Sequence, residues 1–435
     1  MLNYALLLLA ACLLAATCAS AAVPAGFVTT NGATFEVDGK PFRFAGANNY
    51  YLNYQSPAMV ADALDRAAAR NMTVIRTWAF LDIGHPDGSQ SVDGGGAKNG
   101  VWFRALDPVT RKVVLNESGL AHLDATLVAA HARGLRLILT LTNNWQDFGG
   151  ADQQIRWEAL LDPTYTDPAH DDFFTRPWQI QTYIDYATAL AGRTNSLSGV
   201  AYRDDPTIFG WELMNEPRCQ GSGVYRSTNN CTLNYAVYNT TPVAFKIPPW
   251  VDTVSAAIKA ADPHHLVAVG DEGFLCDEYQ AFPDMVGDCY VGTDFVRQTA
   301  LPHIDFASMH LYPEAWGRGG SGAAAWGAAW IANHSAAATA LGKPLVLGEF
   351  GVGSSAAQAQ TYAAWTGQIL AGGVAGDLFW MLCGRQDYGP AWYPNYDGFC
   401  VYCSNASDPA PPGGDAQSCG VLAAHAAAMA ASSTG

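Results

Sequence analysis

The sequence predicts an α/β protein of the (β/α)8 TIM barrel class, and three observations support this prediction. Eight short runs rich in apolar, β-branched and aromatic residues recur along the 435 residues, at 42–47, 74–80, 135–142, 208–215, 266–270, 306–312, 345–350 and 377–382. Helical patterns lie between most of these runs, and strands that alternate with helices favour a parallel sheet. Eight such units are the number that closes the sheet into a barrel.

The eight runs are expected to be barrel strands because most of them are apolar throughout. Continuous apolar runs are typical of parallel strands that are covered on both faces. Upstream of the first run, residues 27–43 contain Asn31-Gly32 and Asp38-Gly39, which favour tight hairpin turns. We therefore predict an N-terminal β-hairpin that plugs one end of the barrel.

The helices are recognised by their ends and by their apolar spacing. Ser56 and Pro57 suit the N-cap and the first position of a helix. A second helix is expected over about 118–133, because apolar residues recur there at helical spacing and Gly134 favours a stop. Further helices are expected near 178–191, 250–261, 323–341 and 356–370.

The chain is longer than the roughly 250 residues that a barrel of this class takes. The surplus lies in five predicted long loops, at 84–116, 143–176, 221–249, 276–300 and 383–418. Each follows the carboxyl end of a predicted strand, and in these barrels that face holds the active site. We expect one catalytic domain over residues 22–435, with a tail rich in Pro, Gly and Ala from about residue 408.

The amino terminus is predicted to be a signal peptide over residues 1–21. Residues 4–22 carry no charge, and an apolar stretch ends in Ala19-Ser20-Ala21, which fits the cleavage pattern. The alternative is an uncleaved membrane anchor, but the apolar part is shorter than the roughly 20 residues that a span needs. We therefore expect a secreted protein, extracellular or in a cell wall, with no membrane partner after cleavage.

Secretion changes the meaning of the cysteines. Eight remain after residue 21, and an even number in a secreted chain indicates disulfides, with Cys219–Cys231 and Cys276–Cys289 as plausible local pairs. The alternative is zinc at Cys400 and Cys403, but no second cysteine pair or histidine cluster completes such a site. A glycoprotein is also expected, because N-glycosylation sequons occur at Asn71, Asn116, Asn230, Asn239, Asn333 and Asn405.

The composition excludes several classes of protein. Apolar residues make up 49% of the chain, so a mainly disordered chain is excluded. The net charge of -16 argues against nucleic acid as a partner and disfavours acidic polysaccharides. A neutral substrate remains compatible with this charge, and the 13 Trp, 19 Tyr and 18 Phe are a generous supply of aromatic rings. The sequence does not predict an oligomeric state.

Two carboxylates close predicted strands on opposite sides of the barrel. Glu216 follows the fourth run and precedes Pro217, and Glu349 lies at the end of the seventh run. Taken singly, either could be a helix cap or a salt-bridged residue. Together they indicate glycoside hydrolysis, in which one carboxyl group protonates the leaving oxygen and the other attacks the anomeric carbon or activates water.

Arg76 and Trp78 end the second run, and an arginine inside a barrel wall is costly unless an acid pairs with it. We expect Glu349 to be this partner, because a nearby cation favours the ionised carboxylate. Glu216 is expected to have no such cation and to stay protonated. A purely structural ion pair is the alternative for Arg76.

Further polar and aromatic residues follow other strands. His310 and Tyr312 are two apart and so share one face, from which Tyr312 could donate to Glu349 and His310 could contact sugar or hold the acid. Trp380 ends the eighth run as a candidate stacking floor for the reacting sugar, with a core Trp as the alternative. His131 lies in the helix before the third run, and a structural role is expected for it.

Four runs of sequence together resemble glycoside hydrolase family 5: Asn215-Glu216-Pro217, Leu347-Gly348-Glu349-Phe350-Gly351, Ile75-Arg76-Thr77-Trp78-Ala79-Phe80 and Ser308-Met309-His310-Leu311-Tyr312-Pro313. Within that family the chain resembles the endo-β-1,4-mannanases of plants and fungi. The narrower similarity lies in 210–219 (GWELMNEPRC), in Asn143-Asn144-Trp145 and in Val101-Trp102-Phe103. It spans about residues 26–382, nearly the whole mature chain.

The resemblance implies a retaining endo-β-1,4-mannanase that acts on mannan, galactomannan or glucomannan, with Glu216 as acid/base and Glu349 as nucleophile. It implies Asn215 as donor to the sugar 2-hydroxyl and Arg218 toward the leaving group. The central subsite would hold Arg76, Trp78, His310, Tyr312 and Trp380. No metal and no cofactor are required, and the two carboxyl groups should lie ~5–5.5 Å apart, the spacing of retaining enzymes.

The chain departs from its relatives at Leu81, where they often have Asn, and at Asn48-Asn49-Tyr50-Tyr51 in the first strand. These departures affect the outer subsites and not the chemistry. Three alternatives stay open at this point: an endo-β-1,4-glucanase, a mannan transglycosylase on the same barrel, and a non-catalytic carbohydrate-binding barrel.

Overall fold

The computed structural model describes residues 23–433, apart from 95, 222, 229–245, 276–290, 354–356, 390 and 413–415. The predicted signal peptide therefore lies outside the described residues, as do Cys231, Cys276, Cys289, Asn230 and Asn239.

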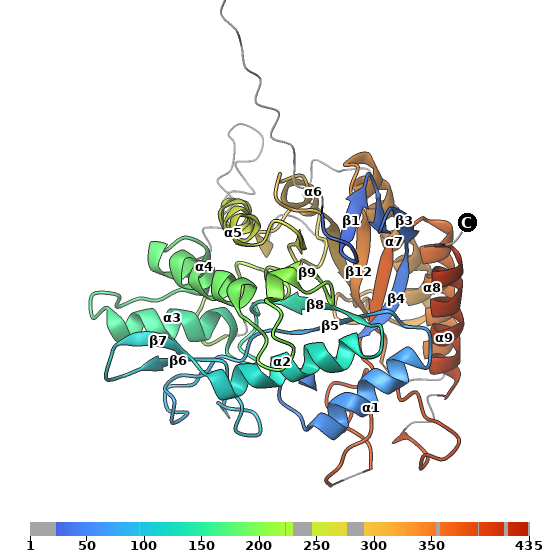
Figure 1. Ribbon diagram of the computed structural model, residues 1–435. Helices are drawn as coiled ribbons and strands as arrows, with labels where there is room; N and C mark the ends of the chain where they lie inside the picture. The colour runs from blue at the N-terminus through green and yellow to red at the C-terminus, as the bar shows by residue number, and fades with distance from the viewer. Residues whose placement is uncertain are drawn as a thin grey trace, which may run out of the picture.

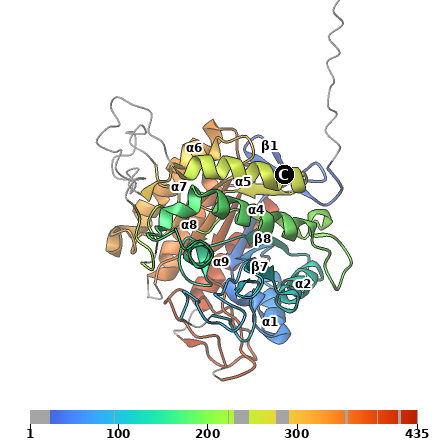
Figure 2. The same cartoon turned by 90° about the vertical axis from the view of Figure 1, so that its left-hand side faces the viewer.

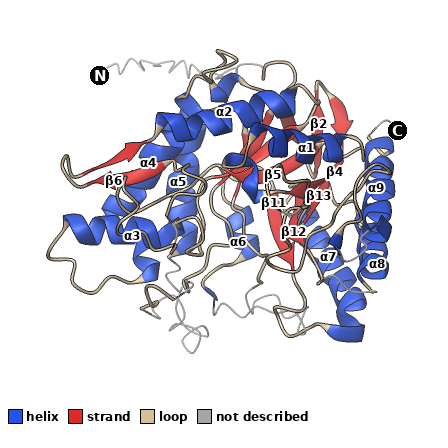
Figure 3. Cartoon of the chain, turned by 90° about the horizontal axis from the view of Figure 1, so that it is seen from below, coloured by secondary structure: helices blue, strands red, loops and turns tan. Residues whose placement is uncertain are grey.

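Eight parallel strands form the central sheet, with the order β10-β9-β8-β5-β4-β13-β12-β11. They are β4 (Phe44–Asn48), β5 (Val74–Trp78), β8 (Arg136–Thr140), β9 (Ile208–Glu212), β10 (Leu266–Ala268), β11 (Ala307–Leu311), β12 (Leu345–Phe350) and β13 (Gly376–Phe379). Six of them lie within the predicted runs, and β4 and β13 each extend one residue beyond theirs. Helices surround the strands (Figure 3). The barrel prediction is confirmed.

Hydrogen bonds between β10 and β11 and the residues beside them close the barrel. The Asp305 amide donates to the Val267 carbonyl at 2.8 Å, and the His310 amide donates to the Glu272 carbonyl at 3.2 Å. The Gly270 amide donates to Ser308 Oγ at 2.9 Å. The closure brings the ends of β9, β11 and β12 to one rim.

The six predicted helices are present. α1 begins at Pro57, and its N-cap Ser56 accepts a hydrogen bond from the Met59 amide, as the sequence predicts. After α2, Gly134 has a φ of +67°, a conformation that suits glycine at a helix end. α4 and α5 lie side by side (Figure 2). The six are α1 (Pro57–Ala68), α2 (Glu117–His131), α4 (Pro177–Gly192), α5 (Ile247–Ala261), α7 (Ala323–Ala340) and α8 (Gln358–Ala371).

Several elements lie in segments that the sequence analysis treated as loops. These are a hairpin of β6 (Arg104–Asp107) and β7 (Lys112–Leu115), α3 (Gly150–Leu161), and the short α6 (Phe295–Thr299). α3 escaped prediction because it begins at Gly149-Gly150, both with positive φ, and because much of its buried surface is polar. An apolar stripe, which normally indicates a helix, is therefore missing from it.

The C-terminal tail ends in the helix α9 (Ala416–Ala431), which the sequence analysis did not predict. α9 lies beside α8 and β4 (Figure 1). His425 Nε2 lies 2.7 Å from Asp377 Oδ2 of β13, and both side chains are buried. Its many alanines give no periodic stripe of large apolar residues, so the sequence pattern is weak although the helix is tied to the barrel.

Disulfides hold the segment before α9. Cys383 pairs with Cys400, and Cys403 pairs with Cys419. Cys400 and Cys403 are thus in two different disulfides, so the zinc alternative for this pair is wrong. Cys219 is also disulfide-bonded, and its predicted partner Cys231 lies outside the described residues.

A small antiparallel sheet of β1 (Val28–Asn31), β2 (Thr34–Val37) and β3 (Lys40–Phe42) covers the amino-terminal end of the barrel, with one strand more than the predicted hairpin. Phe35 is fully buried, with ring centroids 5.1 Å from Phe209 and 5.6 Å from Phe306. These rings lie at the starts of β9 and β11, so the predicted plug is confirmed. No helix within the described residues combines the length and apolarity of a membrane crossing.

We predict that Phe35→Ala lowers the free energy of unfolding by about 3–5 kcal/mol, because it leaves a cavity beneath the starts of β9 and β11. Urea unfolding of purified protein measures this. Val109→Ala is the control, because Val109 is 88% exposed at the tip of the β6–β7 hairpin and should change stability by less than about 0.5 kcal/mol. A loss below about 1 kcal/mol for Phe35→Ala would contradict the role of the plug.

Candidate active site

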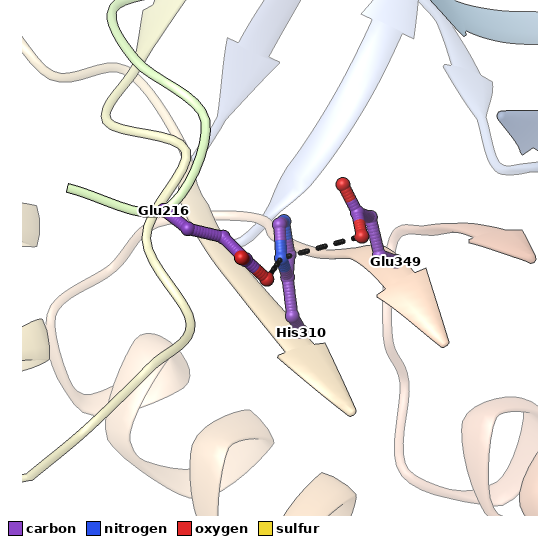
Figure 4. Close-up of side chains that lie close together, drawn as sticks. All are labelled: Glu216, His310 and Glu349. Atoms are coloured by element: carbon purple, nitrogen blue, oxygen red, sulfur yellow. Dashed lines mark hydrogen bonds and ion pairs between the residues drawn. The ribbon is translucent and has the colours of Figure 1, made fainter. Parts of the chain in front are cut away.

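Glu216 and Glu349 meet at the carboxyl rim of the barrel. Glu349 belongs to β12, whereas Glu216 follows β9 and has a φ of +51°, which is uncommon for a residue other than glycine. Its amide donates to the Gly270 carbonyl at 2.8 Å, which fixes this turn of the backbone. One oxygen of each carboxylate and Nδ1 of His310 all lie within 4.8 Å of one another (Figure 4).

The Arg76 guanidinium lies beneath this pair, and all five of its N–H donors have acceptors. Nε and NH2 donate to Glu212 Oε1 at 2.8 and 2.5 Å, and NH1 donates to Glu349 Oε1 at 2.5 Å. The remaining two donors reach Asn48 Oδ1 at 3.0 Å and Asn215 Oδ1 at 2.8 Å. The predicted pairing of Arg76 with Glu349 is confirmed, but Glu349 shares this guanidinium with Glu212.

Glu212 is a second partner of Arg76, which the sequence motifs did not indicate. Its side chain is 2% exposed, and it also accepts a hydrogen bond from Thr140 Oγ1 at 2.8 Å. Glu212 lies four residues before Glu216, at the end of an otherwise apolar strand. A buried carboxylate needs a cation partner, just as a buried arginine needs an acid. The acid within an apolar run was therefore the feature of the sequence that could have indicated this pair.

The two candidate catalytic carboxylates have different partners. Tyr312 donates its hydroxyl to Glu349 Oε2 at 2.7 Å, as the sequence predicts. Nδ1 of His310 lies 2.7 Å from Glu216 Oε1 and 3.7 Å from Glu349 Oε2, so His310 stands between them (Figure 4). Trp145 Nε1 donates to Glu216 Oε2 at 2.7 Å, a contact that sequence reasoning missed.

The expectation that Glu216 has no cation beside it is wrong, because His310 and Arg218 both act on this carboxylate. Burial disfavours the charged form of Glu216, but the hydrogen bond and charge of His310, with the charge of Arg218, lower its pKa to about 2. Burial raises the pKa of Glu349 above its ordinary value, against the charges of His310 and Arg76. The physical reason is that His310 lies closer to Glu216, while Arg76 is divided between Glu349 and Glu212.

Nδ1 of His310 faces both carboxylates, and their charges favour the protonated form of the ring. Burial lowers the pKa of the ring, but the charges of Glu349 and Glu216 outweigh it and raise that pKa above the ordinary value. Three titratable groups in such contact exchange protons as a unit. The same three side chains have the ligand types and spacing of a divalent-cation site, although their oxygens already accept hydrogen bonds from Arg76, Tyr312 and Trp145.

Tryptophan rings flank the carboxylates. The Arg76 guanidinium lies 4.8 Å from the Trp78 ring centroid, a cation–π contact. The Trp380 ring lies 5.8 Å from both Trp78 and Tyr50, and its Nε1 donates to Asp397 Oδ2 at 2.7 Å. Trp380 is thus held in place at the cleft wall, where the sequence analysis expected a stacking floor.

Arg218 lies on the other side of Glu216. Its Nε and NH2 each donate to one oxygen of Glu272 at 2.5 Å, and its guanidinium lies 5.3 Å from the Trp145 ring and 5.1 Å from the Phe274 ring. Burial and the charge of Glu216 raise the pKa of Glu272 to about 7. Glu272 was not singled out from the sequence, because it lies in no motif that the sequence analysis used.

These residues surround an open cleft of about 980 Å³. Seven of the nine sequence-predicted site residues line it: Trp78, Asn215, Glu216, Arg218, Tyr312, Glu349 and Trp380. Arg76 and His310 are buried behind the cleft wall, so they act on the carboxylates from below. His131 lies away from the cleft with Nδ1 3.0 Å from Thr207 Oγ1, a structural position as expected.

A barrel with two facing carboxylates in an open cleft at its carboxyl rim defines the class of glycoside-cleaving enzymes. The model of the family described as GH family 5 beta-mannosidase-like matches residues 25–369. The chain therefore belongs to glycoside hydrolase family 5.

Individual relatives agree with this assignment. Mannan endo-1,4-beta-mannosidase F of Aspergillus fumigatus is 32% identical over 395 residues, which cover 89% of this chain and 77% of that protein. Mannan endo-1,4-beta-mannosidase A of Aspergillus aculeatus is 32% identical over 393 residues, or 89% of each chain. The crystal structure of the endo-1,4-beta-mannanase from Rhizomucor miehei matches with a TM-score of 0.75 at 34% identity, covering 93% of this chain and 99% of that one.

We predict that the interaction of Glu216 with His310 stabilises the fold within a window of pH. The lowered pKa of Glu216 contributes stability above its ordinary value of 4.5, and this is lost as pH falls toward 2. The raised pKa of His310 contributes stability below its ordinary value of 6.5, and this is lost as pH rises through the folded value. The coupling energy should therefore be largest between pH 4.5 and 6.5, at about 1–3 kcal/mol.

A double-mutant cycle with Glu216→Gln and His310→Asn, followed by urea unfolding from about pH 3 to about pH 8, measures this coupling. A coupling energy that stays constant over that range would contradict an ion pair and would indicate a neutral hydrogen bond.

Proposed function

We propose that this chain is a secreted retaining endo-β-1,4-mannanase, which hydrolyses internal β-1,4-mannosidic bonds of mannan, galactomannan or glucomannan. The observation that carries the mechanism is the separation of the carboxylates, one oxygen of each lying within 4.8 Å of the other. Retaining enzymes hold the two groups ~5–5.5 Å apart, whereas inverting enzymes need ~6.5–9.5 Å to admit a water molecule. The spacing therefore supports double displacement.

In the first step Glu349 attacks the anomeric carbon, and the bond from that carbon to the leaving oxygen breaks. The leaving oxygen takes a proton that passes from His310 through Glu216, across the 2.7 Å between them, so that Glu216 is left as a carboxylate and the His310 ring as neutral. Arg76 and Tyr312 each hold one oxygen of Glu349, which aims the nucleophile at one carbon. A covalent glycosyl-enzyme results.

In the second step water attacks the same carbon and releases Glu349. Glu216 is a carboxylate after the first step and takes the proton of the attacking water. It can pass this proton back to His310, so both groups return to their starting protonation. Two inversions at one carbon retain the β configuration. Asn215 lines the cleft with its amide fixed by Arg76 and by Asn143 Oδ1 at 3.0 Å, which suits it to hold the sugar 2-hydroxyl.

The substrate class is supported by the family and by the cleft. The two Aspergillus relatives are named for mannan, and the Rhizomucor miehei structure is described as an endo-1,4-beta-mannanase. A cleft of about 980 Å³ that holds Trp78 and Trp380 on its walls suits several sugar rings of a neutral polysaccharide. The net charge of -16 is compatible with such a substrate.

Secretion is part of this proposal. Residues 1–21 have the composition of a signal peptide, and the disulfides Cys383–Cys400 and Cys403–Cys419 are of a kind that persists in oxidising compartments. The mature protein would then be one catalytic domain over residues 22–435, acting outside the cell without a metal or organic cofactor.

The experiment is product analysis after incubation of purified protein with linear β-1,4-mannan and, separately, with soluble cellulose. Short manno-oligosaccharides with a β anomer as first product are expected, with cellulose untouched. Cleavage of cellulose alone would overturn the substrate assignment, and an α anomer would overturn the mechanism.

We predict that Glu349→Ala lowers kcat on mannan by roughly 10³-fold or more, because no other described group is placed to form the covalent intermediate. Its circular dichroism and thermal unfolding should still report a folded barrel. Glu117→Ala is the matched control, because Glu117 is 74% exposed at the start of α2 and should leave kcat unchanged. Substantial turnover by pure Glu349→Ala protein would remove Glu349 from the mechanism.

A further inference from the structure

The segment between Cys383 and Cys400 forms one wall of the cleft and is tied at both ends. The Cys383–Cys400 disulfide joins its ends, and the Cys383 amide donates to the Val401 carbonyl at 3.1 Å. The segment follows Trp380 directly, and Asp397 within it accepts the Trp380 Nε1 hydrogen bond. A loop anchored in this way can hold side chains at fixed positions along the cleft.

Tyrosines of this segment continue the aromatic wall away from the carboxylates. Ring contacts run from Trp380 to Tyr50 at 5.8 Å, from Tyr50 to Tyr393 at 6.1 Å, and from Tyr393 to Tyr396 at 5.7 Å. The Tyr393 hydroxyl lies 3.0 Å from the hydroxyls of both Tyr50 and Tyr54. The inner tyrosines are thus locked together.

The outer two tyrosines differ because they face water. Tyr396 is 76% exposed and Tyr388 is 51% exposed, and both line the cleft. The Tyr388 hydroxyl donates to Gln55 Oε1 at 3.0 Å, and Asn99 Nδ2 donates to the same oxygen at 2.9 Å, which holds the phenol while leaving much of its surface free. Tyrosine offers a large apolar face and a polar tip, a combination typical of binding surfaces.

We propose that Tyr388 and Tyr396 form a distal binding site for the sugar residues of a neutral β-linked chain, beyond the residue that Glu349 attacks. This site rests on the proposed function and deepens it, because it makes the enzyme selective for long chains. It lies on the non-reducing side, since Glu216 faces the leaving group and Arg218 and Glu272 lie beyond Glu216. The ring contact between Tyr50 and Tyr393 joins the segment after β4 to the segment between Cys383 and Cys400.

The test compares a long and a short substrate on one double variant. Tyr388→Ala with Tyr396→Ala should raise KM for mannohexaose roughly fivefold to tenfold, because two ring faces are lost, and leave kcat/KM for the shortest cleaved oligosaccharide unchanged. Both residues are exposed, so the variant should fold. The matched control is Tyr388→Phe with Tyr396→Phe, which keeps both rings and should retain most of the affinity.

An equal loss on both substrates, or no loss on either, would overturn the distal site. Wild-type protein that cleaves only cello-oligosaccharides would instead overturn the proposed function, and the same comparison made on that series would still test the site.

A second inference rests on the shared cation beneath Glu349. Arg76 gives two of its five N–H donors to Glu212 and one to Glu349. Two carboxylates therefore divide one positive charge in a site that excludes water. Full pairing with Arg76 would weaken Glu349 as a nucleophile, because a cation that stabilises the carboxylate also lowers its tendency to share electrons.

We infer that Glu212 is a positioning residue that draws Arg76 partly away from Glu349 and so keeps the nucleophile basic. Glu349 is faced by Arg76 from β5, by His310 and Tyr312 at β11, and by Glu216 after β9. Glu212 acts on it only through Arg76.

The test is the pH dependence of kcat/KM on an oligosaccharide that the wild type cleaves. Glu212→Gln should move the acidic limb to lower pH, because Arg76 then serves Glu349 alone. Thr140→Val removes the hydroxyl that Glu212 accepts at 2.8 Å, concentrates the charge of Glu212 on Arg76 and should move the limb slightly to higher pH. Thr140→Val keeps the shape of the side chain, so it serves even if Glu212→Gln does not fold.

Asp82→Asn is the matched control, because Asp82 is a fully buried partner of Arg104 and has no contact with Glu349 among the described residues. It should lower stability without moving the acidic limb. Glu212→Gln and Thr140→Val could instead lower stability or kcat while the acidic limb of the pH profile stays in place. In that case Glu212 only supports the fold, and the inference is overturned. An inactive wild type would bear on the proposed function alone.

Discussion

The burial of one guanidinium constrains the whole catalytic end of this barrel. Arg76 is withdrawn from water inside the wall, and leaving any of its donors unpaired would cost free energy. Its acceptors come from β4, from β9 and the residues after it, and from β12, so these segments must keep their register. The requirement to satisfy one cation thereby fixes the positions of Asn215 and Glu349.

The groups that exchange protons lie next to the residues that Arg76 fixes. Glu349 is held from below by Arg76, while Glu216 is held from the side by His310 and Trp145. One nucleophile is therefore oriented by a group that never releases its charge, and one acid is oriented by a group that can give and take a proton. The structure separates the two tasks that a retaining glycosidase assigns to its two carboxylates.

The sequence alone predicted the barrel because parallel strands are written as continuous apolar runs, and it predicted the Arg76–Glu349 and Tyr312–Glu349 contacts because strand ends share a rim. Prediction from the sequence failed where a property depends on how several residues contact one another. Glu212 looked like part of a strand, and the protonation of Glu216 and Glu349 depends on how Arg76 is shared and on which side of His310 each lies. α3 was missed because polar side chains make up much of its buried surface.

The cleft outside this centre obeys a different constraint. The wall from Trp380 to Tyr396 is built from a disulfide-tied segment and the residues after β4, and no donor of Arg76 depends on the outer tyrosines. Change in the outer part of this wall is therefore possible without change in the contacts that hold the two carboxylates. The residues of the barrel wall determine which bond is broken, whereas the segment between Cys383 and Cys400 can determine the length of the sugar chain that binds.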